Sequence, residues 1–232
     1  MKKTKLALLC MVAIMASCNS SHKMDLVLSP STATLHHDEQ QYVHIVGEPT
    51  NVEWKSDDEY VAKVDNGTII GNHVGTTIVR AHVNNQKGSC TVTVTPKYHT
   101  YKEPLTNWRL TKNEVISVKG TPYRTSGSKI YYQQAENIFE AYDFENEVMI
   151  NSAIILPLTS ISVADFLLER YELYYLEDRN GTDMYYFINA LSFESANLIV
   201  ALGVQSSQNM LVVMYAPANT GVNKIATRIS AM

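Results

Sequence analysis

The chain has 232 residues, with 23 acidic and 19 basic side chains and a formal net charge of −4. Nucleic acid and anionic lipid surfaces are bound through basic patches, so this acidic balance argues against both as partners. The length is sufficient for one or two domains.

The chain begins with Lys2, Lys3 and Lys5, followed by the run LALLCMVAIMAS. About a dozen apolar or small residues are too few to cross a hydrocarbon core of roughly 30 Å as a helix. A cationic start followed by a short apolar run predicts an export signal at residues 1–17, which would be removed from the mature protein. No other stretch is apolar for long enough to predict a membrane span.

The small residues Ala16 and Ser17 directly precede Cys18. This arrangement resembles the lipobox of bacterial lipoproteins, in which the cysteine carries lipid and becomes the first residue of the mature chain. The resemblance implies that Cys18 is a lipid attachment site, that residues 18–24 form a tether, and that the membrane is reached through this lipid. Since no aspartate follows Cys18, it also implies the outer rather than the inner membrane of the cell envelope, with the side it faces left open. An ordinary signal peptide with an incidental cysteine is the alternative.

Residues 25–95 contain short alternating runs, including YVHIV at 42–46 and CTVTVT at 90–95. Alternation with turn residues between the runs predicts an antiparallel β-sandwich. Cys90, Val92 and Val94 share one strand face, which predicts a buried and chemically inert thiol. With Cys10 lost and Cys18 lipidated, Cys90 would have no partner for a disulfide within the mature chain.

The sequence of this segment resembles the bacterial immunoglobulin-like group 2 domain, known as Big2. The resemblance rests on LVLSPSTATL, then VEWKSDDEYVAKVDNGTIIGNHVGTTIVRAHV, then CTVTVTP. It implies a compact sandwich with Trp54 in the core between the sheets, and a role as a spacer or an adhesive module. His36, His37 and Asp38 raise the question of a metal site. Adjacent strand residues point to opposite faces and no third ligand is near in sequence, so we expect a solvated loop and no metal.

Residues 96–106, which begin PKYHTYKEPL, predict an interdomain linker stiffened by its prolines. Beyond it, LTKNEV at 110–115 and ISVADF at 161–166 share one pattern: apolar, hydroxyl, two free positions, carboxylate, apolar. Each is typical of a helix start with a capping box and a hydrophobic staple, and predicts short helices near 111–118 and 162–170.

A series of strand-like runs follows each predicted helix start, which indicates internal duplication of one unit of helix plus antiparallel sheet. The predicted fold is therefore multidomain: an N-terminal all-β immunoglobulin-like sandwich, then an α+β domain at 107–217, then a polar tail at 218–232. The α+β part resembles tandem β-lactamase-inhibitor-protein-like domains, on TKNEV followed by Gly120-Thr121-Pro122 and later Tyr131-Tyr132.

Tyrosine is concentrated in this second domain, partly as adjacent pairs at 131–132, 174–175 and 185–186. In a strand, neighbouring side chains face opposite sides, so one ring of each pair is expected on a sheet face left open by the helices. Such a face suits a glycan or an envelope protein, and the candidate ligand-binding residues are Tyr132, Tyr175 and Tyr186. The alternative is that tyrosine is simply common in strands.

Carboxylates at Asp143, Glu145 and Glu147 could serve a glycosidase, but a solvated hairpin is the commoner explanation. Residues 178–183, DRNGTD, predict an Asn-Gly turn and not a calcium loop. The chain contains no phosphate loop, H-E-x-x-H or G-x-S-x-G motif. We therefore expect a lipid-anchored, non-enzymatic binding or adhesion module of the cell envelope, without cofactor, in which the immunoglobulin-like domain is a spacer. A glycan-processing hydrolase and a structural subunit of an envelope assembly are the alternatives.

Overall fold

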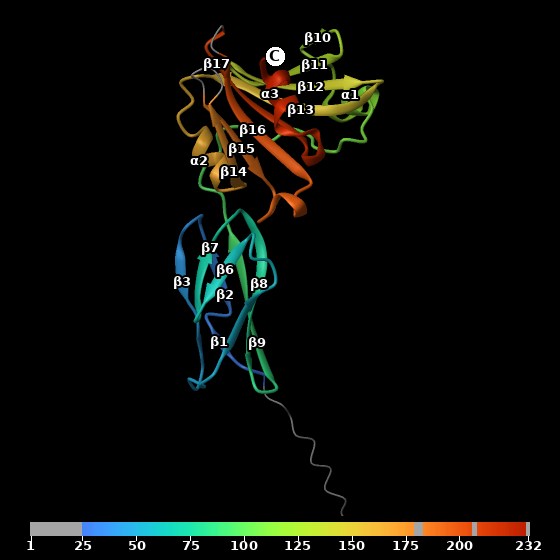
Figure 1. Cartoon of the computed structure of the whole chain (residues 1–232). Coiled ribbons are helices and arrows are strands. Elements are labelled where there is room, and N and C mark those ends of the chain that lie inside the picture. Colours follow the sequence, from blue (N-terminus) through green and yellow to red (C-terminus); the bar gives the residue numbers. More distant parts are fainter. Residues whose placement is uncertain (1–24, 179–182, 206–207, 231–232) are drawn as a thin grey trace, which may run out of the picture.

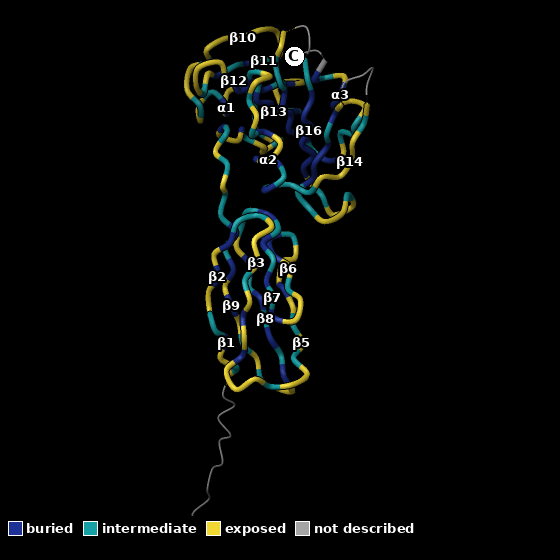
Figure 2. The backbone as a smooth tube through the Cα atoms, turned by 90° about the vertical axis from the view of Figure 1, so that its left-hand side faces the viewer, coloured by how far each residue is buried: buried dark blue, intermediate teal, exposed yellow. Residues whose placement is uncertain are grey.

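The computed structural model describes residues 25–178, 183–205 and 208–230 (Figure 1). The signal peptide at 1–17, Cys18, the tether at 18–24 and most of the predicted Asn-Gly turn lie outside the described residues. Figure 2 shows two bodies joined by one extended segment. We call residues 25–95 the proximal domain and residues 96–230 the distal domain. The chain is rich in strands, and its sheets are almost wholly antiparallel.

The proximal domain is a β-sandwich of one four-stranded sheet, in the order β2-β9-β8-β5, and one three-stranded sheet, in the order β3-β7-β6, with a small β1-β4 pair at its end. All pairs are antiparallel except β2 with β9. The strands are β1 (Leu28–Ser29), β2 (Thr32–Leu35), β3 (Gln40–Tyr42), β4 (His44–Ile45), β5 (Glu53–Ser56), β6 (Ala62–Asp65), β7 (Thr68–Gly71), β8 (Gly75–Val83) and β9 (Gln86–Val94).

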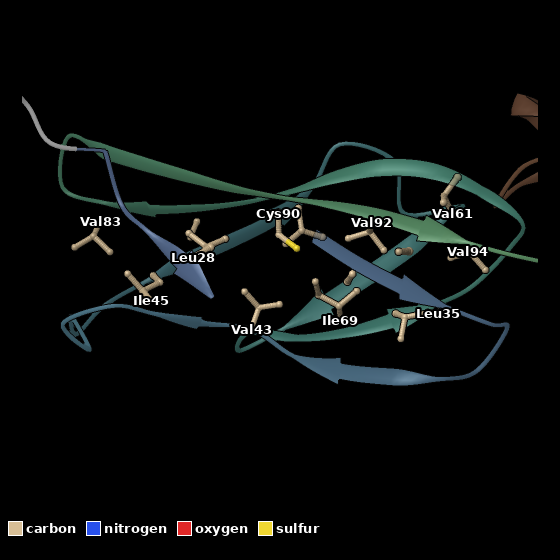
Figure 3. Packing of buried hydrophobic residues seen from close by; sticks show 14 residues of the cluster. Leu28, Leu35, Val43, Ile45, Val61, Ile69, Val83, Cys90, Val92 and Val94 are labelled. Carbon is tan, nitrogen blue, oxygen red and sulfur yellow. The ribbon is translucent and has the colours of Figure 1, made fainter. Parts of the chain in front are cut away.

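The core of the proximal domain is aliphatic and lies between the two main sheets (Figure 3). Cys90, Val92 and Val94 alternate with outward-facing threonines along β9 and are all buried, as the alternation predicts. Burial also raises the pKa of the Cys90 thiol. The cysteine therefore serves as a small hydrophobic residue.

The distal domain is built on one eight-stranded sheet in the order β10-β11-β12-β13-β17-β16-β15-β14. Two four-stranded meanders are joined through the antiparallel pair of β13 and β17, so that each half follows its own helix, α1 or α2. Short 3₁₀ turns lie at Phe193–Ser195 and Ala218–Thr220. The elements are α1 (Lys112–Lys119), β10 (Arg124–Ser126), β11 (Lys129–Ala135), β12 (Ile138–Glu145), β13 (Val148–Pro157), α2 (Val163–Leu168), β14 (Glu172–Asp178), β15 (Asp183–Ile188), β16 (Leu198–Gln205), β17 (Met210–Pro217) and α3 (Val222–Ser230).

The two helices that begin the repeats lie on the same face of this sheet. Val115 of α1 packs with Tyr142 of β12, and Phe166 of α2 packs with Ile154 of β13. Tyr142 is the register partner of Ser152, two residues before Ile154, so both contacts are on one side of the sheet.

The opposite face is covered in part by α3, and the predicted polar tail at 218–232 is therefore wrong for residues 222–230. Ile225, Ala226 and Ile229 lie on one side of this helix and pack with Met214 of β17 in a single buried cluster. The spacing of three and four residues between them is that of a helix face. Asn223, Lys224 and Arg228 lie between the apolar positions and give the segment its polar look.

The two predicted helix starts behave differently. At α1 the Thr111 side chain and Glu114 form the complete capping box, and Leu110 packs with Val115 as the staple requires. At α2 the Ser162 hydroxyl makes no capping bond, because it pairs with the Thr100 hydroxyl at 2.8 Å. The α2 capping box is thus absent although the sequence pattern is present.

Residues 96–106 connect the domains but belong structurally to the distal one. The Tyr101 ring packs on Phe166, and its hydroxyl meets the Tyr215 hydroxyl at 2.8 Å inside the domain. The Leu105 N–H donates to the Tyr142 hydroxyl at 3.0 Å, and its carbonyl accepts from Ser152 Oγ at 2.8 Å. The segment is therefore anchored to the distal domain at Tyr101 and Leu105, although some residues between them are exposed.

Candidate functional surfaces

The three candidate tyrosines occupy three different environments. Tyr186 is fully buried under α3, and Tyr132 is 7% exposed beneath α1, where its hydroxyl donates to the Gly120 carbonyl at 3.1 Å. Tyr175 is 46% exposed on the edge strand β14. The expectation that Tyr132 and Tyr186 lie on an open face is therefore wrong, because α1 and α3 cover them, and only Tyr175 is placed to meet a partner.

The pair Tyr174-Tyr175 also departs from strict alternation. The β14–β15 register shifts between Leu173 and Tyr175, which inserts one extra residue at a β-bulge. Tyr174 stacks on Phe193 at 4.9 Å, and Tyr175 lies 6.0 Å from Tyr186; both contacts are with residues of the α3 side. The bulge therefore places both rings on the same side.

A groove of about 450 Å³ lies on the part of the sheet that α3 leaves uncovered, and we call it the distal groove. The Tyr123 ring stands 5.7 Å from Phe139, and the Arg124 guanidinium lies 5.6 Å from the centre of the Tyr131 ring. Tyr123 is 66% exposed. The remaining lining residues are Ile155, Gln208 and Met210, so aromatic and aliphatic side chains line the groove together with the polar Gln208 and the cationic Arg124. The open aromatic face thus exists, but with other tyrosines than those predicted.

A larger groove, of about 840 Å³, lies on the proximal domain, and we call it the proximal groove. Trp54 lines this groove and also packs against the core, so its side chain is half-buried. The Big2 resemblance implies a tryptophan enclosed in the core between the sheets, and Trp54 is not wholly enclosed there. The other lining residues are Tyr42, His44, Ile45, Glu48, Pro49, Asn51, Val52 and Asn66.

A third group of polar side chains surrounds a buried carboxylate beneath α1. Glu140 is fully buried; Lys119 Nζ lies 2.6 Å from its carboxylate, Gln134 Nε2 lies 3.0 Å away, and the Tyr142 hydroxyl also donates to it. An adjacent cavity of about 430 Å³ includes His99 and Tyr132 in its lining. The ion pair compensates the cost of burying the charge, which is the usual structural role of such a group.

The carboxylates considered for glycoside chemistry lie near the β12–β13 turn. Asp143 accepts a hydrogen bond from Ser128 Oγ at 2.6 Å, and Lys129 lies 4.0 Å away. Glu145 and Glu147 are exposed.

Among the described residues, no group of three or more His, Cys, Asp or Glu side chains could hold a metal ion. In the predicted histidine loop, His36 Nδ1 lies 2.9 Å from the Thr95 carbonyl.

At the junction between the domains lies a group of closely spaced polar contacts that the sequence patterns do not predict. The Glu169 carboxylate is buried at the end of α2, where it accepts from the N–H groups of Lys97 at 2.8 Å and Tyr98 at 3.1 Å and pairs with Arg170. Its carbonyl accepts from the Val74 N–H of the proximal domain at 2.8 Å. The residue that directly follows α2 thus contacts both the proximal domain and the connecting segment.

Two aromatic side chains of the proximal domain complete this junction. The Tyr60 hydroxyl donates to the Arg170 carbonyl at 2.6 Å, and its ring stacks on His73 at 4.3 Å. His73 is buried, with Nδ1 2.9 Å from the Tyr60 carbonyl and Nε2 3.8 Å from Glu172. Burial lowers the pKa of His73 despite the nearby Glu172 carboxylate, so the ring is neutral at pH 7.

No protein-family model matches the chain, and no curated protein matches it. A solved structure of the surface layer protein SbsC, domains 4–9, aligns with 84% of this chain at 10% identity and a TM-score of 0.26, and the chain covers 31% of that structure. A second structure, domains 5–6 of the S-layer protein SbsC, aligns with 84% of this chain at 10% identity and a TM-score of 0.26, with 96% of that structure covered. The chain thus spans about a third of the first structure, and likeness this low assigns no function. In the described part of the chain, every helix is too short or too polar to span a membrane.

Proposed function

We propose that this protein is a lipid-anchored, non-enzymatic binding module of the cell envelope, with the distal groove as its ligand site. The observation that carries the proposal is the cluster of Tyr123, Tyr131 and Phe139 on the uncovered part of the sheet. Aromatic rings of this kind supply large contact areas at little cost in side-chain entropy. The apolar lining with Arg124 at its rim favours an envelope protein that inserts an apolar side chain next to a carboxylate.

In this proposal the proximal, Big2-like domain is a spacer that holds the groove away from the membrane. The described chain begins near the β8–β9 turn, where the Leu26 N–H donates to the Lys87 carbonyl at 2.8 Å, at the end of the proximal domain remote from the distal domain (Figure 1). The hydrogen bonds of the Val74 N–H with the Glu169 carbonyl and of the Tyr60 hydroxyl with the Arg170 carbonyl join the two domains directly. A stiff spacer presents its terminal surface at a defined distance from an anchored end.

The anchor rests on the lipobox resemblance at Cys18. Replacing this residue, Cys18→Ser, should release the protein from the membrane fraction, because serine has no thiol to carry the acyl chains that would anchor the protein. Membrane partitioning of the exported chain measures this. Unchanged membrane association of the variant would contradict the lipid anchor.

The distal groove can be tested by site-specific photo-crosslinking in cells. A photoreactive amino acid at Tyr123 should yield a crosslinked envelope protein, and the yield should fall in Arg124→Glu, since the change reverses the charge at the rim. Val118, which is 64% exposed on α1, is the matched control position and should give no such product. Equal crosslinking from both positions, or none from Tyr123, would rule out the distal groove as the partner site.

A structural subunit of an envelope assembly is the second candidate, and one observation favours it. β14 is an edge strand on which Leu173, Tyr174, Tyr175 and Leu176 are all about half exposed. Exposed apolar edge strands tend to pair with further strands, and folded proteins commonly protect them. The bulge at Tyr174 gives partial protection.

A further inference from the structure

The proximal groove combines two aromatic rings from different sheets. Tyr42 ends β3 of the three-stranded sheet, and Trp54 lies on β5 of the four-stranded sheet. Gly67, in the β6–β7 turn, lies next to both rings. A Cβ atom at this position would lie 3.2 Å from Tyr42 Cε2 and 3.2 Å from Trp54 Cζ2. The missing side chain therefore lets both rings approach one spot.

The polar lining of the groove comes from strand β4 and from neighbouring turns. Asn51 and Asn66 provide two amides, Glu48 a carboxylate and His44 an imidazole. Glu48, Asn51 and Asn66 all have positive φ values, 45°, 58° and 47°. A left-handed glutamate is uncommon, and such conformations cluster at binding surfaces.

The lining chemistry narrows the class of ligand. Among the described residues that line the groove there is no Lys or Arg, and Glu48 adds a negative charge, so a phosphate or carboxylate ligand is disfavoured. A wholly apolar ligand is disfavoured as well, because it would strip water from the two amides and the carboxylate without replacing their hydrogen bonds. An uncharged ligand with flat C–H faces and many hydroxyl groups satisfies both conditions.

We propose that the proximal groove is a binding site for a neutral saccharide, with pyranose faces against Tyr42 and Trp54 and hydroxyl groups bonded by Asn51, Asn66 and Glu48. A groove of about 840 Å³ lies within the usual size range of small-molecule binding sites. The proximal domain then contributes recognition of its own and is more than a spacer. This site is separate from the distal groove and does not depend on it.

Titration with two probes of equal length, the trisaccharide of N-acetylglucosamine and that of β-linked glucose, tests the site. We expect saturable binding of at least one probe by the mature chain, measured by calorimetry. Tyr42→Ala should weaken it about three- to tenfold, the range that one aromatic contact supplies. Tyr42 is 63% exposed, so its removal should leave the melting temperature nearly unchanged.

Tyr123→Ala is the matched control, because Tyr123 is 66% exposed but lines the distal groove. It should bind the probe as tightly as the unmodified chain does. Trp108→Phe leaves Trp54 as the one tryptophan, so its fluorescence should then report the same titration. No saturable binding of either probe, or binding lost in Tyr123→Ala and retained in Tyr42→Ala, would overturn the proposal.

Discussion

Glu169 makes several polar contacts, although it stands at the end of a helix of only six residues. Its carboxylate satisfies two backbone donors and pairs with Arg170, all in a buried setting. Glu169→Ala should lower the free energy of unfolding by about 2–4 kcal/mol, because it leaves the N–H groups of Lys97 and Tyr98 without their acceptor and removes one of the partners of the Arg170 guanidinium. Urea denaturation followed by circular dichroism measures the loss.

Glu136 provides the control for this prediction. It is exposed next to the β11–β12 turn, and Glu136→Ala should change stability by less than about 0.5 kcal/mol. A Glu169→Ala protein as stable as Glu136→Ala would show that the Glu169 carboxylate contributes no stability.

Single residues also show where sequence reasoning was sufficient and where it was not. The burial of Cys90 follows from alternation within one strand, which is a local property. The placement of Tyr132, Tyr175 and Tyr186 depends on which face each helix covers and on a bulge at Tyr174, and neither is encoded in the spacing of the tyrosines. Tyr123, in the distal groove, precedes β10 and has no adjacent tyrosine, so the pattern of tyrosine pairs did not indicate it.

At the scale of elements, α1 and α2 begin with the same sequence pattern, so the effect of removing the capping hydroxyl can be compared between the two helices. Thr111→Ala should cost about 1 kcal/mol, the usual contribution of a helix cap. Ser162→Ala should not act through the cap of α2, because Ser162 bonds Thr100 instead, so Thr100→Ala should remove the same contact. A double-mutant cycle on Thr100 and Ser162, read from denaturation midpoints, should show clear coupling.

Additive losses at Thr100 and Ser162 would contradict this assignment.

The difference between the two helices has a local reason that the sequence pattern does not reveal. Ile161, the staple position before α2, is 94% exposed, whereas Leu110 before α1 packs with Val115. A capping motif gives the potential for a cap, and tertiary contacts decide whether it forms.

The edge strand β14 allows a test of the assembly candidate. Leu173 and Leu176 pair in register with Phe187 and Tyr185, which both pack on the α2 side. Placing lysine at both leucines should suppress self-association, because charged side chains on an edge oppose strand pairing. Sedimentation velocity over a concentration series measures it, with Val118→Lys as the control on α1. An unmodified chain that stays monomeric throughout would count against the structural-subunit candidate.

At the scale of the whole molecule, the sequence predicted two bodies and a connecting segment but not how firmly they are joined. The repeat pattern identified two meanders, since each begins with a recognisable helix start. The closing helix α3 was missed because only Ile225, Ala226 and Ile229 form its apolar face within a polar segment. The junction was missed because its contacts join residues far apart in the chain, such as Tyr60 with Arg170.

The buried His73 should make this junction sensitive to pH. Its pKa in the folded protein lies below the ordinary value of 6.5, chiefly because burial disfavours the charged ring, whereas the unfolded chain takes up a proton near 6.5. Below that pH the unfolded state binds more protons than the folded state, so stability falls as the pH drops below 6.5 and is fully present above it. The groups that face the ring are Tyr60, Glu172 and His37.

Acidification from about pH 7.5 to pH 5 should therefore loosen the contact between the domains. Small-angle X-ray scattering should show a broader distribution of molecular dimensions at the lower pH. In His73→Gln, which has no titrating ring but keeps hydrogen-bonding capacity, the dimensions and the stability should change less over the same range. His99 is exposed in the connecting segment, and His99→Gln should respond to pH as the unmodified chain does. If His73→Gln and the unmodified chain respond identically, the pH sensitivity of the junction resides in another group.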